Sequence, residues 1–222
     1  MRSSRDFSIP LAKLLNQGVA IRVASLNTST GAAPDGHLAE ACVQQAMVEL
    51  LTVHLPSADM IKQNEKMVEH HSLGGCIPDV IVNNVGDGVW GMFEIKTLLA
   101  DDQLGVAEVV RDLEKLCAYK AKYPKAAAVF LLVGSRSKLF NPNRTAAWSD
   151  LKISYGHDSF SGGPLKQQAV NEKYVAIPCG SYNVEGFPTV CFMWEIQPVG
   201  HTLQTLSSFF SYQARMIRAK GG

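Results

Sequence analysis

The sequence has no long apolar run and no cysteine pattern that would define a disulfide framework or a zinc site. No apolar stretch approaches the length of about 18 residues that a membrane-spanning helix needs. The five cysteines are odd in number, contain no CxxC pair and lie in apolar stretches, as expected for reduced thiols buried in a core. We therefore expect a cytoplasmic protein that does not associate with a membrane.

Several common catalytic motifs are missing as well, and the overall charge is close to neutral. The formal net charge of +1 does not indicate a nucleic-acid-binding protein, although a whole-chain sum can hide a local basic face. The chain has no H-E-x-x-H, no G-x-S-x-G and no G-x-x-x-x-G-K-[ST] motif. A formal match to G-x-G-x-x-G at residues 86–91 leads into a β-type run instead of a helix, so we reject a dinucleotide site there.

The sequence does contain enough apolar residues for one sizeable core. Hydrophobic residues make up 46% of the 222 positions, which predicts a single domain over residues 1–222. Apolar residues at helical spacing predict helices, and short apolar or alternating runs predict strands. The expected helices are 37–54, 102–122 and 202–217, and the expected strands are 67–72, two runs within 77–96, then 126–133, 174–178 and 189–196.

The most informative stretch is 77–96, in which two β-type runs flank a Gly-Asp-Gly turn. If the two-residue loop is Gly86–Asp87, Asp79 lies opposite Glu94. If the loop begins one residue later, Asp79 lies opposite Lys96. Because side chains alternate along a strand, both registers place Asp79, Glu94 and Lys96 on one face. Two carboxylates and an ammonium group are therefore expected on one patch of a hairpin.

Two carboxylates about one strand spacing apart can share a divalent cation. Mg²⁺ prefers oxygen ligands, and Asp79, Glu94 and the backbone carbonyl of Ile95 would leave coordination positions for water and a phosphate oxygen. The cation would lower the pKa of its water, and Lys96 would orient that water or neutralise developing charge. The alternative is a surface hairpin whose cross-strand ion pairs contribute little to stability.

The spacing of these residues resembles the motif of the PD-(D/E)xK nuclease superfamily. A Pro-Asp dipeptide ending at Asp79 is followed fifteen residues later by Glu94 and then by Lys96, and a predicted helix and a buried strand come next. The resemblance covers about residues 37–134 and implies a restriction-endonuclease-like α/β fold, with a central mixed sheet flanked by helices. Residues 135–222 would add a loop-rich extension with extra strands and a C-terminal helix. The resemblance also implies that Asp79 and Glu94 bind Mg²⁺ or Mn²⁺ and that Lys96 assists the attacking water.

A further acidic residue is expected to complete the site. Nucleases of this superfamily often begin with a helix whose early glutamate faces the metal, and Glu40 matches that place in the helix 37–54. Glu40 could instead simply favour the positive end of the helix. Glu49 and Glu69 are weaker candidates for the same role.

The charges in one part of the chain are strongly unbalanced. Residues 111–144 contain eight basic and two acidic residues, a net charge of +6. Such a run is usually a solvated face, but contacts to DNA phosphates need the same feature. The predicted phosphate contacts are Arg111, Lys115, Arg136, Lys138 and Arg144.

Together with the resemblance, these features predict a Mg²⁺-dependent DNA endonuclease, for example a restriction-type enzyme. Its predicted catalytic residues are Asp79, Glu94, Lys96 and Glu40. The alternatives are a catalytically inactive nucleic-acid-binding domain of the same fold and a globular interaction protein. The apolar face of the final helix could pack in the core or form a homodimer interface.

Overall fold

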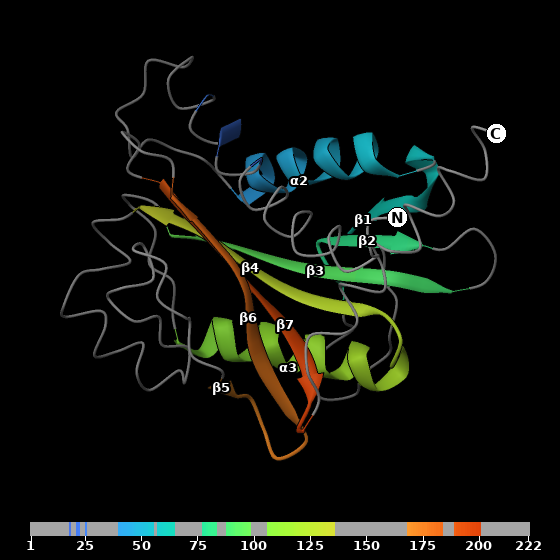
Figure 1. The fold of residues 1–222 in the computed structure, drawn as a ribbon, viewed down its shortest axis with the longest axis vertical. Helices are drawn as coiled ribbons and strands as arrows, with labels where there is room; N and C mark the ends of the chain where they lie inside the picture. The colour runs from blue at the N-terminus through green and yellow to red at the C-terminus, as the bar shows by residue number, and fades with distance from the viewer. Residues whose placement is uncertain are drawn as a thin grey trace, which may run out of the picture.

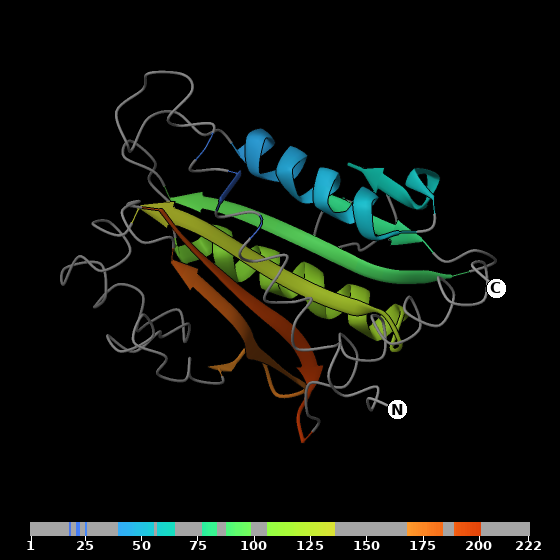
Figure 2. The same ribbon diagram turned by 45° about the horizontal axis from the view of Figure 1, so that its top comes forward.

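The protein is built on a mixed β-sheet with one long helix on each face (Figure 1, Figure 2). Helix α2 (Glu40–His54) covers one face and helix α3 (Val106–Lys122) covers the other. The structure, a computed structural model, describes residues 18, 21, 22, 25, 40–55, 57–64, 77–83, 88–98, 106–135, 168–183 and 189–200. The architecture confirms the predicted α/β class with a central mixed sheet flanked by helices.

The sheet contains seven strands in the order β1-β2-β3-β4-β7-β6-β5. Strands β3 and β4 are parallel, and every other neighbouring pair in this sheet is antiparallel. Because parallel strands need a long crossover connection, α3 links the end of β3 to the start of β4. The strands are β1 (Ile61–Gln63), β2 (Val80–Asn83), β3 (Val89–Leu98), β4 (Ala127–Ser135), β5 (Gln168–Ala169), β6 (Tyr174–Asn183) and β7 (Thr189–Pro198), and a 3₁₀ helix, η2 (Ala58–Met60), precedes β1.

Strand β4 is buried on both faces of the sheet. Its residue Phe130 belongs to the apolar cluster beneath α3, which also contains Leu116 and Trp194. Its neighbour Val129 belongs to the cluster beneath α2, which also contains Met47. Because successive side chains point to opposite faces and both faces are covered, the sequence of β4 is apolar almost throughout.

The structure confirms most predicted elements in the described residues and corrects two details. The sequence predicts a connection from residue 180 onward, but β6 continues to Asn183 because a register shift between Pro178 and Gly180 accommodates both residues inside the strand. Strand β1 is not predicted, since three residues are too short for a recognisable alternation. The predicted strand 67–72 and helix 202–217 lie outside the described residues.

Two further predictions concern membrane-spanning helices and the burial of the cysteines. No helix in the described part of the chain has both the length and the apolar character needed to cross a membrane. The thiols of Cys117 and Cys191 are free and buried, and that of Cys42 is free and half-buried. Cys117 and Cys191 therefore match the expected buried thiols, whereas Cys42 is only half-buried.

Candidate active site

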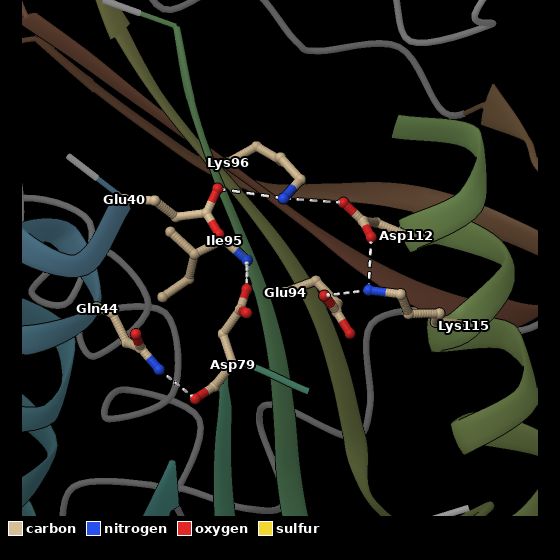
Figure 3. A network of polar contacts seen from close by, with 8 residues as sticks. All are labelled: Glu40, Gln44, Asp79, Glu94, Ile95, Lys96, Asp112 and Lys115. Carbon is tan, nitrogen blue, oxygen red and sulfur yellow. Dashed lines mark hydrogen bonds and ion pairs between the residues drawn. The ribbon is translucent and has the colours of Figure 1, made fainter. Parts of the chain in front are cut away.

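The candidate site lies where β3 extends beyond β2. Because β2 begins at Val80, which pairs with Phe93, the described part of β2 does not flank the second half of β3, from Glu94 to Leu98. The start of α2 and the middle of α3 lie on either side of this part of β3 (Figure 3). Side chains from both faces of the sheet therefore meet at this edge. The C-terminal ends of parallel strands are also where ligands commonly bind in α/β sheets.

Asp79 is the residue immediately before β2, and Glu94 lies on the neighbouring strand β3. The register of β2 and β3 places Asp79 opposite Glu94 and not opposite Lys96, which decides between the two predicted registers. The backbone N–H of Asp79 donates to the carbonyl of Phe93 at 3.1 Å. The Asp79 carboxylate accepts the N–H of Ile95 through Oδ2 at 2.6 Å. Backbone hydrogen bonds thus fix Asp79 beside the strand that carries Glu94.

Helix α2 contributes two side chains to the site. Glu40 is its first residue, and Oε2 of Glu40 lies 3.1 Å from Nζ of Lys96. One turn later, Nε2 of Gln44 donates to the backbone carbonyl of Asp79 at 2.6 Å. The sequence predicts Glu40 but not Gln44, although residues four positions apart share a helix face. Helix α2 therefore brings Glu40 to Lys96 and Gln44 to Asp79 from the same face, whereas a contact of Glu40 with a metal stays a prediction.

Helix α3 contributes Asp112 and Lys115. Nζ of Lys115 lies 2.7 Å from Oδ1 of Asp112 and 3.1 Å from Oε2 of Glu94. Nζ of Lys96 lies 3.3 Å from Oδ2 of Asp112. Asp112 is not predicted as a site residue, although it falls three residues after Val109 on the apolar stripe of the helix. A charged residue on a buried stripe was the signal that could have identified it.

Burial and repulsion act together on the two facing carboxylates. Glu94 is 1% exposed, and burial raises the pKa of its carboxyl group well above the usual value. The Asp79 carboxylate raises the pKa of Glu94 further, whereas Lys115 lowers it. Burial also raises the pKa of Asp79, although the hydrogen bond from Ile95 opposes this change. Neither carboxylate has enough positive charge nearby to offset its loss of solvent.

For the two lysines, the charges of neighbouring carboxylates outweigh the effect of burial on the pKa. Burial favours the neutral amine of Lys96, but the carboxylates of Asp112 and Glu40 outweigh it and raise the pKa of Lys96. Burial likewise opposes the charge on Lys115, but Glu94 and Asp112 raise its pKa. Both lysines are therefore held as cations at neutral pH.

The arrangement of oxygen atoms fits a divalent cation held by Asp79 and Glu94. Oε1 of Glu94 is buried and accepts no hydrogen bond from any described residue. Asp79 uses Oδ2 for the Ile95 N–H, which leaves Oδ1 for a ligand. When ionised, the four carboxylates of the cluster exceed its two ammonium groups by two charges, which one divalent cation would balance. Carboxylate oxygens are also the ligands that Mg²⁺ and Mn²⁺ prefer.

The site does not contain a complete set of metal ligands. Among the described residues, no group of three or more His, Cys, Asp or Glu side chains is arranged to hold a metal ion. Two carboxylates alone leave most of the coordination sphere of Mg²⁺ to water and substrate oxygens, which is common for this ion.

The other predicted site residues lie away from the cluster or outside the described residues. Glu49 lies on α2 and forms an ion pair with Arg22 at 3.2 Å, so it does not complete the site. Arg111 is exposed on α3. Lys115, predicted to contact phosphate, is instead found inside the cluster, with its side chain 16% exposed. The predicted residues outside the described part of the chain are Glu69, Arg136, Lys138 and Arg144.

Comparisons of the chain with protein-family models, with curated proteins and with solved structures found no match.

Proposed function

We propose that the protein is a Mg²⁺- or Mn²⁺-dependent DNA endonuclease with a restriction-endonuclease-like fold of the PD-(D/E)xK type. The observation that carries this proposal is the placement of Asp79 opposite Glu94 at the edge of β3, with Lys96 two residues further along the same strand. The order of hairpin, helix and buried parallel strand supports the same assignment.

Each residue of the cluster has a role in this proposal. Asp79 and Glu94 hold the divalent cation, and Glu94 offers the buried oxygen that accepts no hydrogen bond from the described residues. When bound, Mg²⁺ supplies Lewis acidity at the scissile phosphate and favours deprotonation of the attacking water. Lys96 is held as a cation by Glu40 and Asp112, so it orients the water and stabilises negative charge on the phosphate.

The basic part of the chain supports DNA as the substrate. Arg111 is exposed on α3, next to Asp112, and it opens the segment 111–144 with its net charge of +6. Exposed basic side chains near the cluster would hold the phosphate backbone without reading its sequence. In this proposal Arg111 binds DNA, whereas Lys115 acts inside the site.

One observation supports this proposal over an interaction protein with a structural ion-pair cluster. A purely structural cluster should satisfy its buried polar atoms, because an unsatisfied buried oxygen costs stability. Oε1 of Glu94 is buried without a hydrogen-bond partner among the described residues. That atom is a natural position for a ligand, and its presence favours a binding site over a structural one.

The proposal is tested by incubating the protein with duplex, single-stranded and branched DNA in Mg²⁺, in Mn²⁺ and in EDTA. We expect cleavage of at least one substrate with either cation and none in EDTA. The variant Glu94→Gln should lose cleavage, whereas Glu49→Gln, which neutralises an acid of α2 outside the cluster, should keep it. A wild-type protein that binds DNA but cleaves none of these substrates would instead support the catalytically inactive domain.

A further inference from the structure

Asp112 joins the two lysines of the site. Its Oδ1 lies 2.7 Å from Nζ of Lys115, and its Oδ2 lies 3.3 Å from Nζ of Lys96 (Figure 3). The Asp112 side chain is only 5% exposed. Lys115 has a second partner, Glu94, at 3.1 Å. Lys115 is therefore shared between two carboxylates, and its shorter contact is to Asp112.

This sharing matters because Lys115 and a divalent cation would both interact with Glu94. A cation bound through the free Oε1 of Glu94 would repel the Lys115 ammonium from Oε2 of the same carboxylate. The side chain of Lys115 is 16% exposed, so if Glu94 were its only partner, losing that contact would leave a largely desolvated ammonium unpaired. Leaving one member of a buried ion pair without its partner is strongly unfavourable. Asp112 avoids this state, since it stays paired with Lys115 when Glu94 turns to the cation.

We propose that Asp112 is a positioning residue that keeps Lys115 and Lys96 paired while Glu94 exchanges the Lys115 ammonium for a divalent cation. Asp112 acts through the two lysines and is not itself a ligand of the cation. The inference rests on the proposed function, because it assumes that Asp79 and Glu94 hold the cation. It assigns a role to Asp112, a residue that the motif of Asp79, Glu94 and Lys96 does not include.

The exchange is measured as Mn²⁺ affinity by isothermal titration calorimetry on the full chain without DNA. Asp112→Asn keeps the shape of the side chain but removes its charge, so Glu94 becomes the remaining carboxylate partner of Lys115. We expect the Mn²⁺ affinity of this variant to fall by about tenfold, the lower end of the range for residues that support metal ligands. The matched control is Glu114→Gln, which removes an exposed acid from the same helix and should leave the affinity unchanged.

A second substitution separates the exchange from a simple change in local charge. Lys115→Met removes the competing ammonium, so it should restore most of the affinity lost in Asp112→Asn. In the otherwise native chain the same substitution should increase affinity only slightly, because Asp112 already holds Lys115. If the substitutions acted only through their charges, Lys115→Met would raise the Mn²⁺ affinity by the same factor in the native chain and in Asp112→Asn. If Asp112 and Lys115 act together, the two factors differ measurably.

The outcomes distinguish this inference from the proposed function. Unchanged Mn²⁺ affinity in Asp112→Asn, or equal gains from Lys115→Met in both backgrounds, overturns the inference and leaves the nuclease proposal standing. A wild-type protein that neither binds Mn²⁺ nor cleaves DNA overturns both. If circular dichroism shows that Asp112→Asn does not fold, Lys115→Met alone decides. A small increase in Mn²⁺ affinity supports the proposal. An increase of about tenfold or more shows that Lys115 competes with the cation for Glu94 although Asp112 is present, which contradicts the proposal.

Discussion

The ammonium group of Lys96 lies 3.1 Å from a carboxylate oxygen of Glu40, although 56 positions separate the two residues in the sequence. Lys96 is on β3 and Glu40 begins α2, so this contact ties the helix to the strand at the edge of the sheet. The same ammonium also contacts Asp112 on the opposite face. Lys96 thus connects the helices that cover the two faces of the sheet.

Replacing Glu40 by Gln tests whether this contact serves the reaction. The Glu40 side chain is 40% exposed, so solvent screens the ion pair, and the free energy of unfolding should change by less than about 1 kcal/mol. Cleavage should fall by about tenfold to a hundredfold, because Lys96 loses one of the groups that orient it. Urea unfolding and cleavage rates measure the two effects. A loss of activity that merely follows a loss of folded protein would contradict a role for Glu40 in the site.

Lys96→Ala should separate cation binding from cleavage. The substitution removes no proposed ligand, so the increase in melting temperature caused by Mg²⁺ should persist. Cleavage should nevertheless fall by about two to four orders of magnitude, the scale for losing a positioned proton-transfer or electrostatic group. Lys96→Arg, which keeps the charge but not the shape of the head group, should recover only part of the activity. Full activity in Lys96→Ala would remove Lys96 from the mechanism.

The buried thiol of Cys117 predicts a loss of stability in alkali. Burial raises the pKa of this thiol from 9.0 to about 12. The folded state therefore holds the proton more tightly than the unfolded state. This contribution to stability is complete below pH 9 and is lost as the pH rises from 9 towards 12. Between about pH 8 and pH 10.5, the wild type should lose about 2 kcal/mol more of its free energy of unfolding than Cys117→Ala. Equal losses in urea titrations would show that the folded thiol ionises normally.

Lys120 supplies a test of the core on the α3 side. Its side chain is buried, and Nζ donates to the carbonyl of Ala126 at 2.7 Å. Burial lowers the pKa of Lys120, and the carboxylate of Glu195 opposes this change. Lys120→Met would remove the hydrogen bond to Ala126 and a positive charge near buried Glu195, so the free energy of unfolding should fall by about 1–3 kcal/mol. The control Lys122→Met, at an exposed position of the same helix, should change stability by less than about 1 kcal/mol.

Adding Glu195→Gln to Lys120→Met should recover part of the lost stability, because a neutral amide does not need the positive charge that Lys120 supplied. Thermal or urea unfolding of Lys120→Met, Glu195→Gln and the double variant decides the question. If the double variant is less stable than Lys120→Met by the full effect of Glu195→Gln alone, the two residues do not interact.

Local pattern was sufficient to predict the two strands and the shared face of Asp79, Glu94 and Lys96. The exact partner of Asp79 was not predictable, because it depends on a β-bulge between Val82 and Asn83 that shifts the register near the turn. Neither simple two-residue loop includes that bulge. The register became clear only from the pairing of the strands themselves.

The contributions of α3 were harder to predict. Helical spacing identifies Asp112 as part of the buried face, but not which strand residues that face will contact. The basic segment that contains Lys115 predicts a contact with phosphate. The contacts of Lys115 to Glu94 and Asp112 arise from the packing of α3 against β3, which single-sequence patterns do not encode. Glu40, by contrast, is predicted near the site by the resemblance to the PD-(D/E)xK superfamily, and its position at the start of a helix alone would indicate only an interaction with the helix dipole.

The most direct test of the proposed site is the Mg²⁺ dependence of the cleavage rate for the wild type and Asp79→Asn on the same labelled DNA duplex. Asparagine can still accept the Ile95 N–H, so the fold should be kept while one negative ligand is lost. We predict that the wild-type rate rises with Mg²⁺ to saturation and is abolished by EDTA, and that the rate of Asp79→Asn is lower by about three orders of magnitude or more. Cleavage by folded Asp79→Asn at the wild-type rate, or wild-type cleavage that persists in EDTA, would contradict a cation-dependent reaction centred on Asp79 and Glu94.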